Sequence, residues 1–295
     1  PIYHIYSLSV LVLAGYTNGG LNVLITNPRD TDGFVKEIKK WRFTFFNGVN
    51  TLYEALLNHP DIKNVNFDSM KLSGTGGSAC RQSTAERWQE LTGNVLLEGY
   101  GLSETSPSVS VSPAYLTKFN GFVGLPVPST EISIRDDEGK QVRRGEPGEI
   151  CVKGPQVMQG YWGNEEATKE AIDEDGFFKT GDIGTLNSDG FIKIVDRKKD
   201  MILVSGFNVY PNEIEDVVSL HPDIIEAACI GVDDEKTTEA VKLFVVKSNP
   251  NLSIDEVLDY CRDNFTGYKV PKHIEFIDEL PKSNVGKVLR RSLRD

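Results

Sequence analysis

Short apolar runs alternate with helical patterns over residues 1–115. In residues 33–41, Phe34, Ile38 and Trp41 recur at i, i+4 and i+7, the spacing of one helix face. Similar patterns predict further helices over residues 52–57 and 80–91. Apolar runs predict strands directly after Pro1 and over residues 22–26, 43–46, 70–73 and 94–97. Because alternating strands and helices imply a parallel sheet with crossover helices, we expect a Rossmann-like αβ subdomain here.

The pattern changes to short strands and tight turns over residues 116–196. The runs EISIR, EICVKG and FIKIVD are separated by turn sequences, DDEG at residues 136–139 and NSDG at residues 187–190. Turn residues between alternating apolar and polar positions are typical of antiparallel hairpins. We therefore expect a β-barrel-like subdomain in this part of the chain.

A charged run, DRKKD at residues 196–200, indicates a domain boundary. Beyond it, strands are expected over residues 201–204, 225–232 and 241–247, and Pro211 is placed near the start of a helix. Ser253 and Glu256 have the spacing of a capping box, ahead of another apolar helix face. The expected fold class is thus α/β, with a small α+β domain over residues 197–295.

The composition narrows the classes of protein. Lys and Arg number 32 against 43 Asp and Glu, and the net charge of −11 disfavours nonspecific nucleic-acid binding. A chain of 295 residues with 39% hydrophobic positions usually forms more than one globular unit. The 4 cysteines form no CxxC pair, which argues against a zinc site and fits a reducing compartment. The opening PIYHIYSL lacks the basic region of a secretory signal, and its abruptness indicates a fragment of a longer chain.

A glycine-rich segment, SGTGGSA at residues 73–79, lies between a predicted strand and a predicted helix. Glycines let the backbone approach a ligand closely, and a helix N-terminus favours anions. Gly74, Gly76 and Ala79 also satisfy the G-x-G-x-x-A pattern, with the acidic Glu98 at the end of the next strand. A nucleotide site, a plain tight turn and a nicotinamide fingerprint all remain open at this point.

The run GYGLSETS at residues 99–106 directly follows a predicted strand. The carboxyl end of a parallel strand is where open α/β sheets bind ligands. The Ser103 hydroxyl could donate a hydrogen bond to a phosphate, and the Glu104 carboxylate could hold Mg²⁺. The alternative is a solvated loop that only caps a helix.

YGLSE resembles the YGxTE motif of the adenylate-forming enzymes, which include acyl-CoA synthetases, luciferases and nonribosomal adenylation domains. Further segments match the family in order, and the best resemblance is to bacterial long-chain fatty acid–CoA ligases: PIYHI at the chain opening, DGFFKTGDI at residues 175–183, VDRKKD at 195–200, LVSGFNVYPNEIE at 203–215 and PKSNVGKVLRR at 281–291. Ser103 stands where threonine is commoner, and Phe177 where tryptophan is usual. The family's phosphate loop, which ends in Pro-Lys-Gly, has no counterpart here, so the chain resembles the carboxyl-terminal portion of such a ligase.

The resemblance implies two half-reactions, with ATP, Mg²⁺ and coenzyme A as cofactors. A fatty acid and ATP give acyl-adenylate and pyrophosphate, and the coenzyme A thiol then displaces AMP. The resemblance gives the catalytic roles to Lys287, Glu104 and Ser103, with Glu104 as the Mg²⁺ ligand. Without the resemblance, Lys287 would be one surface lysine among many.

Further binding roles follow from the resemblance, residue by residue. Those assigned to the nucleotide are Gly76, Gly77 and Ser78 beside the adenine, Tyr100 and Gly101 against it, Asp182 on the ribose hydroxyls, and Arg197 on the ribose or a phosphate. Read without the family, Tyr100 would be a core residue, Asp182 a turn cap and Arg197 a surface charge.

The resemblance also implies movement of the small domain. Asp196 matches the hinge, and Ser205, Gly206 and Phe207 match the loop that meets the pantetheine arm of coenzyme A. His4 is either a gate beside the acyl pocket or a packed core residue between Tyr3 and Tyr6.

Other functions compete with a long-chain ligase. An aryl or coumarate-type CoA ligase would share every catalytic motif, and a nicotinamide oxidoreductase would leave TGD and PKSNVGK unexplained. A noncatalytic nucleotide-binding fragment is a further alternative. We expect a cytoplasmic protein that takes small-molecule substrates and no nucleic acid, and the resemblance leaves room for a peripheral contact with the inner face of the membrane and for a homodimer.

Overall fold

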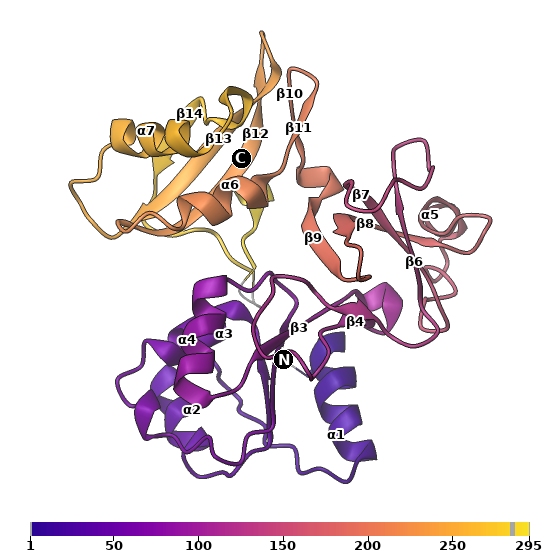
Figure 1. The fold of residues 1–295 in the computed structure, drawn as a ribbon, viewed down its shortest axis with the longest axis vertical. Coiled ribbons are helices and arrows are strands. Elements are labelled where there is room, and N and C mark those ends of the chain that lie inside the picture. Colours follow the sequence, from indigo (N-terminus) through magenta and orange to yellow (C-terminus); the bar gives the residue numbers. More distant parts are fainter. Residues whose placement is uncertain (1, 284–286, 295) are drawn as a thin grey trace. The chain divides into compact units, whose positions relative to one another are not determined.

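The computed structural model describes residues 2–283 and 287–294 (Figure 1). The chain divides into two compact units, which we call the first and the second unit. The first comprises Pro1–Thr180 and Gly184–Ile194, and the second comprises Gly181–Ile183 and Val195–Asp295. The second unit thus begins next to the charged run at residues 196–200.

The first unit contains a sheet with the strand order β1-β2-β3-β4-β5. Strands β1 (Phe45–Gly48), β2 (Leu72–Gly76) and β3 (Leu96–Gly101) are parallel, while β4 (Ser108–Val111) and β5 (Leu125–Pro126) continue the sheet antiparallel. Helix α2 (Thr31–Ile38) precedes β1, while α3 (Asn50–Leu57) and α4 (Gln82–Thr92) connect the three parallel strands in sequence. The predicted alternation of strand and helix is confirmed.

An aromatic core holds this sheet to its helices. Tyr53 on α3 and Trp88 on α4 are fully buried, and their ring centroids lie 4.7 Å apart. The Trp88 indole donates a hydrogen bond of 3.0 Å to the Ser73 hydroxyl on β2, so its polar atom is satisfied inside the core. This packing holds α3 and α4 against β2, and the glycine-rich segment continues from the carboxyl end of that strand.

Two strand predictions near the beginning of the chain are wrong. The opening is helical, with a π-helix η1 (Tyr6–Leu13) followed by α1 (Ala14–Thr17), because a short apolar run cannot be told from a helix by periodicity alone. Residues 22–26 have no strand partner among the described residues, and the neighbouring Leu21 and Leu24 side chains are 79% and 60% exposed. No helix in the described ranges is long and apolar enough to cross a bilayer.

The β-rich part forms a sheet with the order β6-β7-β8-β9. Its strands are β6 (Glu131–Arg135), β7 (Gly148–Lys153), β8 (Phe178–Leu186) and β9 (Ile192–Arg197), with α5 (Glu165–Ala171) between β7 and β8. The predicted NSDG turn joins β8 to β9, where the Asn187 side chain accepts a hydrogen bond of 2.9 Å from the Phe191 amide. The expected barrel is corrected to an open sheet, because β6 and β9 do not pair in the part of the chain that the structure covers.

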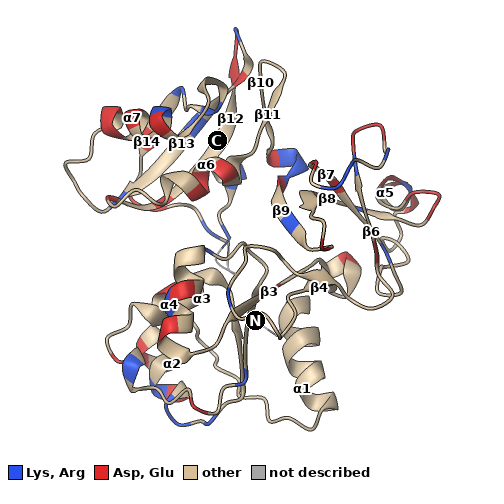
Figure 2. Cartoon of the chain, viewed as in Figure 1, with Lys and Arg blue, Asp and Glu red and all other residues tan. Residues whose placement is uncertain are grey.

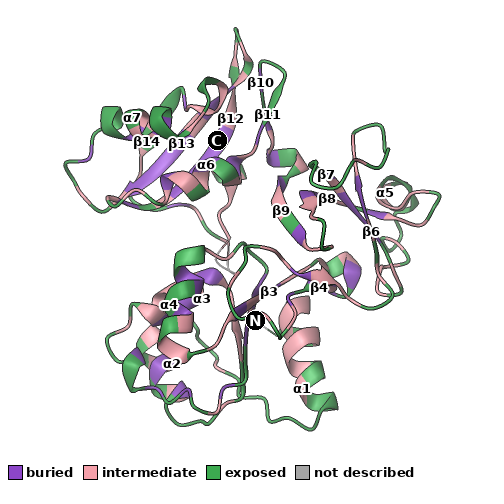
Figure 3. Ribbon diagram, viewed as in Figure 1, coloured by how far each residue is buried: buried purple, intermediate pink, exposed green. Residues whose placement is uncertain are grey.

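The second unit is built on a sheet with the order β11-β10-β13-β12, and β14 pairs with β13. These strands are β10 (Ile202–Val204), β11 (Phe207–Val209), β12 (Ile224–Asp234), β13 (Thr238–Lys247) and β14 (His273–Phe276). Buried positions run along β12 and β13 (Figure 3). Ile214 and Val218 of α6 (Pro211–Val218) and Val257 and Cys261 of α7 (Ile254–Asn264) belong to the same apolar cluster.

Both helix starts predicted in this unit are confirmed. Pro211 occupies the first turn of α6, where its missing amide proton costs nothing. The Ser253 hydroxyl accepts a bond from the Glu256 amide at 3.3 Å, and the Glu256 carboxylate accepts one from the Ser253 amide at 2.9 Å. The capping box therefore starts α7 where its spacing indicated.

Candidate active site

The glycine-rich segment and the loop after β3 begin side by side in the first unit. Gly76 at the end of β2 is paired with Gly99 on the parallel strand β3. A β-carbon at Gly76 would lie 3.0 Å from the Gly99 carbonyl oxygen and 3.2 Å from Cζ of Tyr6, so a larger residue would have to displace its neighbours. Gly77 has a φ of +78°, and both it and Ser78 are exposed. An exposed, glycine-lined backbone can contact a flat ligand directly.

The second loop is held in place by contacts with the segment before α5. Glu104 lies in a short 3₁₀ helix, η3 (Ser103–Thr105). Its carboxylate accepts a hydrogen bond of 3.1 Å from the Tyr161 hydroxyl, and its carbonyl accepts one of 2.7 Å from the Met158 amide. Burial and the neighbouring Glu104 raise the pKa of Tyr161, so the phenol stays protonated as the donor. Ser103 is exposed and Tyr100 is half-buried in β3.

The donor set at Glu104 fits a metal that is shared with a substrate. The described residues contain no cluster of acidic, histidine or cysteine side chains that could enclose an ion. Mg²⁺ is commonly held by one or two carboxylates together with water and substrate phosphates. The carboxylate of Glu104, beside the exposed hydroxyl of Ser103, meets that requirement.

His4 and Tyr6 lie at the start of η1. The His4 Nδ1 atom accepts a bond of 3.3 Å from the Tyr6 amide, and the His4 carbonyl accepts one of 3.0 Å from the Leu8 amide. Tyr6 lies against Gly76, and its hydroxyl donates to the Asn47 side chain. The sequence identifies Tyr6 only as an aromatic neighbour of His4, and its contacts with Gly76 and Asn47 were not predicted.

A second group of predicted residues comes together in the second unit. Asp182 on β8 is only 7% exposed, and its Oδ1 atom lies 3.4 Å from Nε of Arg197 at the end of β9. The Arg197 side chain is 49% exposed and begins a basic run that continues through Lys198 and Lys199 of η4 (Lys198–Asp200) (Figure 2). A buried carboxylate beside an accessible guanidinium offers an acceptor for sugar hydroxyls and a donor for a phosphate.

Lys287 belongs to the same group. Burial, reinforced by the positive charge of Arg197, lowers the pKa of Lys287, and the Asp182 carboxylate opposes this change. Its backbone is tied to Ser283, whose amide donates to the Lys287 carbonyl at 2.8 Å, and residues 282 and 288 form an antiparallel bridge. Residues 284–286 of the PKSNVGK motif lie outside the described residues.

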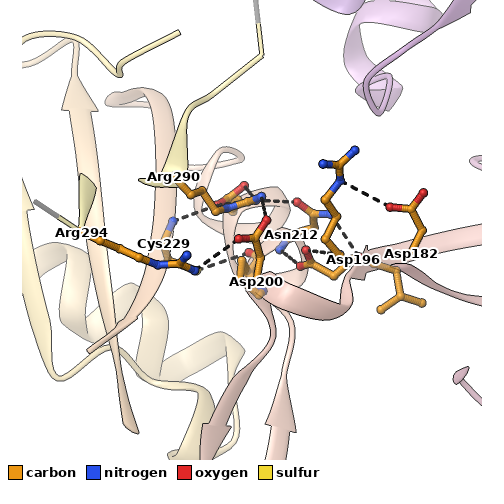
Figure 4. A network of polar contacts seen from close by, with 11 residues as sticks. Asp182, Asp196, Asp200, Asn212, Cys229, Arg290 and Arg294 are labelled. Atoms are coloured by element: carbon orange, nitrogen blue, oxygen red, sulfur yellow. Dashed lines mark hydrogen bonds and ion pairs between the residues drawn. The ribbon is translucent and has the colours of Figure 1, made fainter. Parts of the chain in front are cut away.

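Asp196 is buried within a network of polar contacts (Figure 4). Its two carboxylate oxygens accept bonds of 2.7 Å from the backbone amides of Arg197 and Asn212. Burial raises the pKa of Asp196 despite these bonds. Sequence reasoning found Asp196 but missed its neighbours Asn212, Glu215 and Arg290, although all of them lie within the motifs NVYPNEIE and PKSNVGKVLRR.

The segment expected to meet the pantetheine arm is the turn between β10 and β11. Ser205 and Gly206 have φ values of +52° and +84°. Phe207 is 55% exposed and its ring is stacked on Tyr268, with centroids 4.7 Å apart. The turn therefore presents backbone and an aromatic face to solvent.

Comparisons with known proteins agree over the whole chain. The family model of the AMP-binding enzymes matches residues 1–162, and that of the AMP-binding enzyme C-terminal domain matches residues 213–287. The long-chain-fatty-acid–CoA ligases of Yersinia pestis and Bacillus subtilis are 55% and 39% identical to the chain over 100% and 99% of its length. The chain spans about half the length of these relatives, 52% in both cases.

Solved structures give the same result for the fold. The ATP-bound MatB of Rhodopseudomonas palustris has a TM-score of 0.93 at 33% identity and covers all of this chain, which corresponds to 58% of that structure. The Bacillus subtilis o-succinylbenzoate CoA synthetase in complex with its acyl-adenylate intermediate has a TM-score of 0.86 at 31% identity. Since the first family model alone matches more than half of the residues, this chain belongs to the AMP-binding enzyme family.

Proposed function

We propose that this chain supplies the carboxyl-terminal part of an acid–thiol ligase that activates a long-chain fatty acid with ATP and transfers the acyl group to coenzyme A. The observation that carries the proposal is the grouping of Lys287, Asp182 and Arg197 in the second unit. Relatives 55% identical over the whole chain are named as long-chain-fatty-acid–CoA ligases, which supports the fatty acid as substrate.

In the first half-reaction, a carboxylate oxygen of the acid attacks the α-phosphorus of ATP. An acyl-phosphate bond forms, and the bond to pyrophosphate breaks. Because both reactants are anions, catalysis depends on positive charge placed at the phosphates. The Lys287 ammonium and the Arg197 guanidinium provide this charge, and Ser103 donates a hydrogen bond to a phosphate oxygen.

Mg²⁺ bound at Glu104 would neutralise phosphate charge during this step. The nucleotide is recognised by the remaining residues. Gly76, Gly77 and Ser78 contact the adenine at its edge, Tyr100 and Gly101 lie against it, and the buried Asp182 carboxylate accepts bonds from the ribose hydroxyls.

In the second half-reaction, the sulfur of the coenzyme A thiol attacks the acyl carbonyl carbon, and the thiol proton is released to solvent. A thioester bond forms, and AMP leaves with the electrons of the acyl-phosphate bond. The pantetheine arm is contacted by Ser205, Gly206 and Phe207. Asp196 acts as the hinge about which the small domain turns after the first step. His4 gates the acyl pocket, a role compatible with its half-buried position at the start of η1.

The proposal places the enzyme in the cytoplasm. A long acyl chain gains about 0.8 kcal/mol for each buried methylene in a bilayer, so a peripheral contact with the inner face of the membrane would bring the enzyme to its substrate. A homodimer is proposed on the family resemblance alone.

An aryl acid is the second candidate substrate. It is favoured by a relative named as feruloyl-CoA synthase from Amycolatopsis, 36% identical over the whole chain, and by a solved anthranilate CoA ligase with a TM-score of 0.88. The catalytic groups would be the same in either case.

Calorimetric titration of the purified chain with non-hydrolysable acyl-adenylates tests the proposal. Palmitoyl- and feruloyl-sulfamoyl-adenosine, AMP and NAD serve as the matched ligands. We expect the palmitoyl compound to bind most tightly and NAD not to bind. Tighter binding of the feruloyl compound would indicate an aryl acid as the substrate. A chain that binds NAD but not AMP would contradict the ligase proposal. Because the chain spans about half of its relatives, we expect negligible acyl-CoA formation by the chain itself.

A further inference from the structure

We propose that Asn212 and Arg290 are positioning residues that tie the Lys287 segment to the hinge residue Asp196, so that lysine and hinge move as one body. The inference deepens the proposed function, and it rests on that function for the roles given to Lys287 and to the hinge residue Asp196.

The guanidinium of Arg290 is enclosed by partners from different parts of the second unit. Its side chain is 14% exposed. Nη2 donates to the Glu215 carboxylate at 2.8 Å and to Oδ1 of Asn212 at 2.8 Å, and Nη1 lies 3.6 Å from the Asp200 carboxylate. A planar guanidinium with fixed donors is suited to hold several partners at once, which a lysine ammonium on a flexible stem is not.

Asn212 connects this guanidinium to the hinge. Its backbone amide donates to Oδ2 of Asp196 at 2.7 Å, and its side-chain Nδ2 donates to the Val195 carbonyl at 3.2 Å. The same side chain accepts from Arg290 with its oxygen. An amide side chain has both a donor and an acceptor, so aspartate or leucine could not make both contacts.

The path from Arg290 to Lys287 is short and held at several points. Only Val288 and Leu289 lie between them. The Leu289 amide donates to the Pro281 carbonyl at 2.8 Å, and Val288 packs against a buried cluster. The members of that cluster are Ala228, Ile230, Phe244, Val246 and Leu280. A displacement of Arg290 would therefore be passed on to Lys287.

The chemistry of the network favours a positioning role over simple stabilisation. Arg290 shares Asp200 with Arg294, whose Nη2 lies 3.2 Å from that carboxylate (Figure 4). Replacing a buried ion pair with well-packed apolar residues is often neutral or stabilising. What such a network provides in addition is one defined geometry, and here that geometry joins the hinge to the lysine segment.

Hydrogen–deuterium exchange of the purified chain, followed by mass spectrometry of its peptides, tests the proposal without substrate. In Asn212→Ala, the peptide with Val195–Arg197 and the peptide with Lys287 should both exchange about fivefold faster, as expected when a hydrogen bond of about 1 kcal/mol is lost. Arg290→Lys should act in the same way on both peptides, because the charge is kept but the fork is lost. Peptides of α7 should be unchanged in either variant.

Lys269→Met is the matched control, because it removes the ion-pair partner, at 2.6 Å, of Glu213, which lies beside Asn212 on α6 but outside the network. It should leave both peptides unchanged. The proposal would be overturned if only one of the two peptides exchanged faster, or if exchange increased equally throughout the second unit. It would also be overturned if Arg290→Lys, which keeps the positive charge, exchanged like the unmodified chain. Should Arg290→Lys fail to fold, the exchange of the two peptides in Asn212→Ala, which changes no charge, tests the proposal by itself. The exchange measurement needs no turnover. A negative result would therefore contradict the positioning role alone, whereas the adenylate titration tests the ligase proposal.

Discussion

The Asp182 carboxylate lies 3.4 Å from the Arg197 guanidinium, and the charges of both act on the Lys287 ammonium. The carboxylate is buried while the guanidinium is half exposed, so the paired guanidinium still presents donors to solvent. Two neighbouring motifs and the distant PKSNVGK motif thus contribute to one polar group. This is the arrangement expected around the sugar and phosphate of an adenylate.

The acidity of Lys287 should report this group directly. Arg197→Gln removes a neighbouring positive charge and should raise the pKa of Lys287, whereas Asp182→Asn removes a negative charge and should lower it. An NMR titration of the reductively ¹³C-methylated chain, with Lys287→Arg to assign the signal, measures both values. Lys169, an exposed lysine on α5, is the internal control. Shifts of the same sign in the two variants would contradict the grouping.

Lys287→Ala should reduce adenylation in the complete enzyme far more than thioester formation. Removing one preorganised group that stabilises charge typically costs roughly 100- to 1,000-fold in rate. Acid-dependent pyrophosphate release measures the first step, and conversion of supplied acyl-adenylate measures the second. Lys282, which pairs with Glu226 at 2.6 Å in the same segment, offers the matched alanine control. Equal losses of rate in both steps would contradict a role of Lys287 in adenylation.

Gly76→Ala should weaken both folding and nucleotide binding. The added methyl group would lie 3.0 Å from the Gly99 carbonyl oxygen, and the strain should cost about 1–3 kcal/mol of the free energy of unfolding. Urea unfolding and AMP titration measure the two effects. Gly267→Ala is the control, since a β-carbon there meets nothing within 4 Å. A stable variant with unchanged AMP affinity would contradict the proposed contact between Gly76 and the adenine.

Phe207→Ala should act mainly on the thiol step. The substitution removes the ring stacked on Tyr268 while leaving the turn at Ser205 and Gly206 intact. Aromatic contacts of this kind are worth about 0.5–1.5 kcal/mol, so the affinity for coenzyme A should fall by about two- to tenfold. The KM for coenzyme A in the complete enzyme measures the change. A loss confined to pyrophosphate release would contradict the assignment.

Local signals in the sequence predicted much of the fold. Pro211 and the Ser253–Glu256 pair located their helices because capping chemistry acts within one turn. The NSDG turn located the hairpin of β8 and β9 for the same reason. The strand expected over residues 22–26 failed because a strand needs a neighbour, and pairing is not a local property.

The candidate site was predictable only in part. Motifs pointed to Asp182, Asp196, Arg197 and Lys287, but not to the bonds among them. Arg290 meets Glu215 and Asn212 across separations of 75 and 78 residues, and no periodicity or spacing announces such contacts. They become visible only once β12 and β13 have brought the segments together.

A crystal structure of the chain with palmitoyl-sulfamoyl-adenosine tests the central claim most directly. We predict adenine against Gly76–Ser78 and Tyr100, both ribose hydroxyls on the Asp182 carboxylate, and Lys287 within hydrogen-bond distance of the sulfamoyl group that replaces the phosphate. An adenosine bound elsewhere, or bound with Asp182 and Tyr100 both out of contact, would contradict the assignment of this chain's nucleotide site.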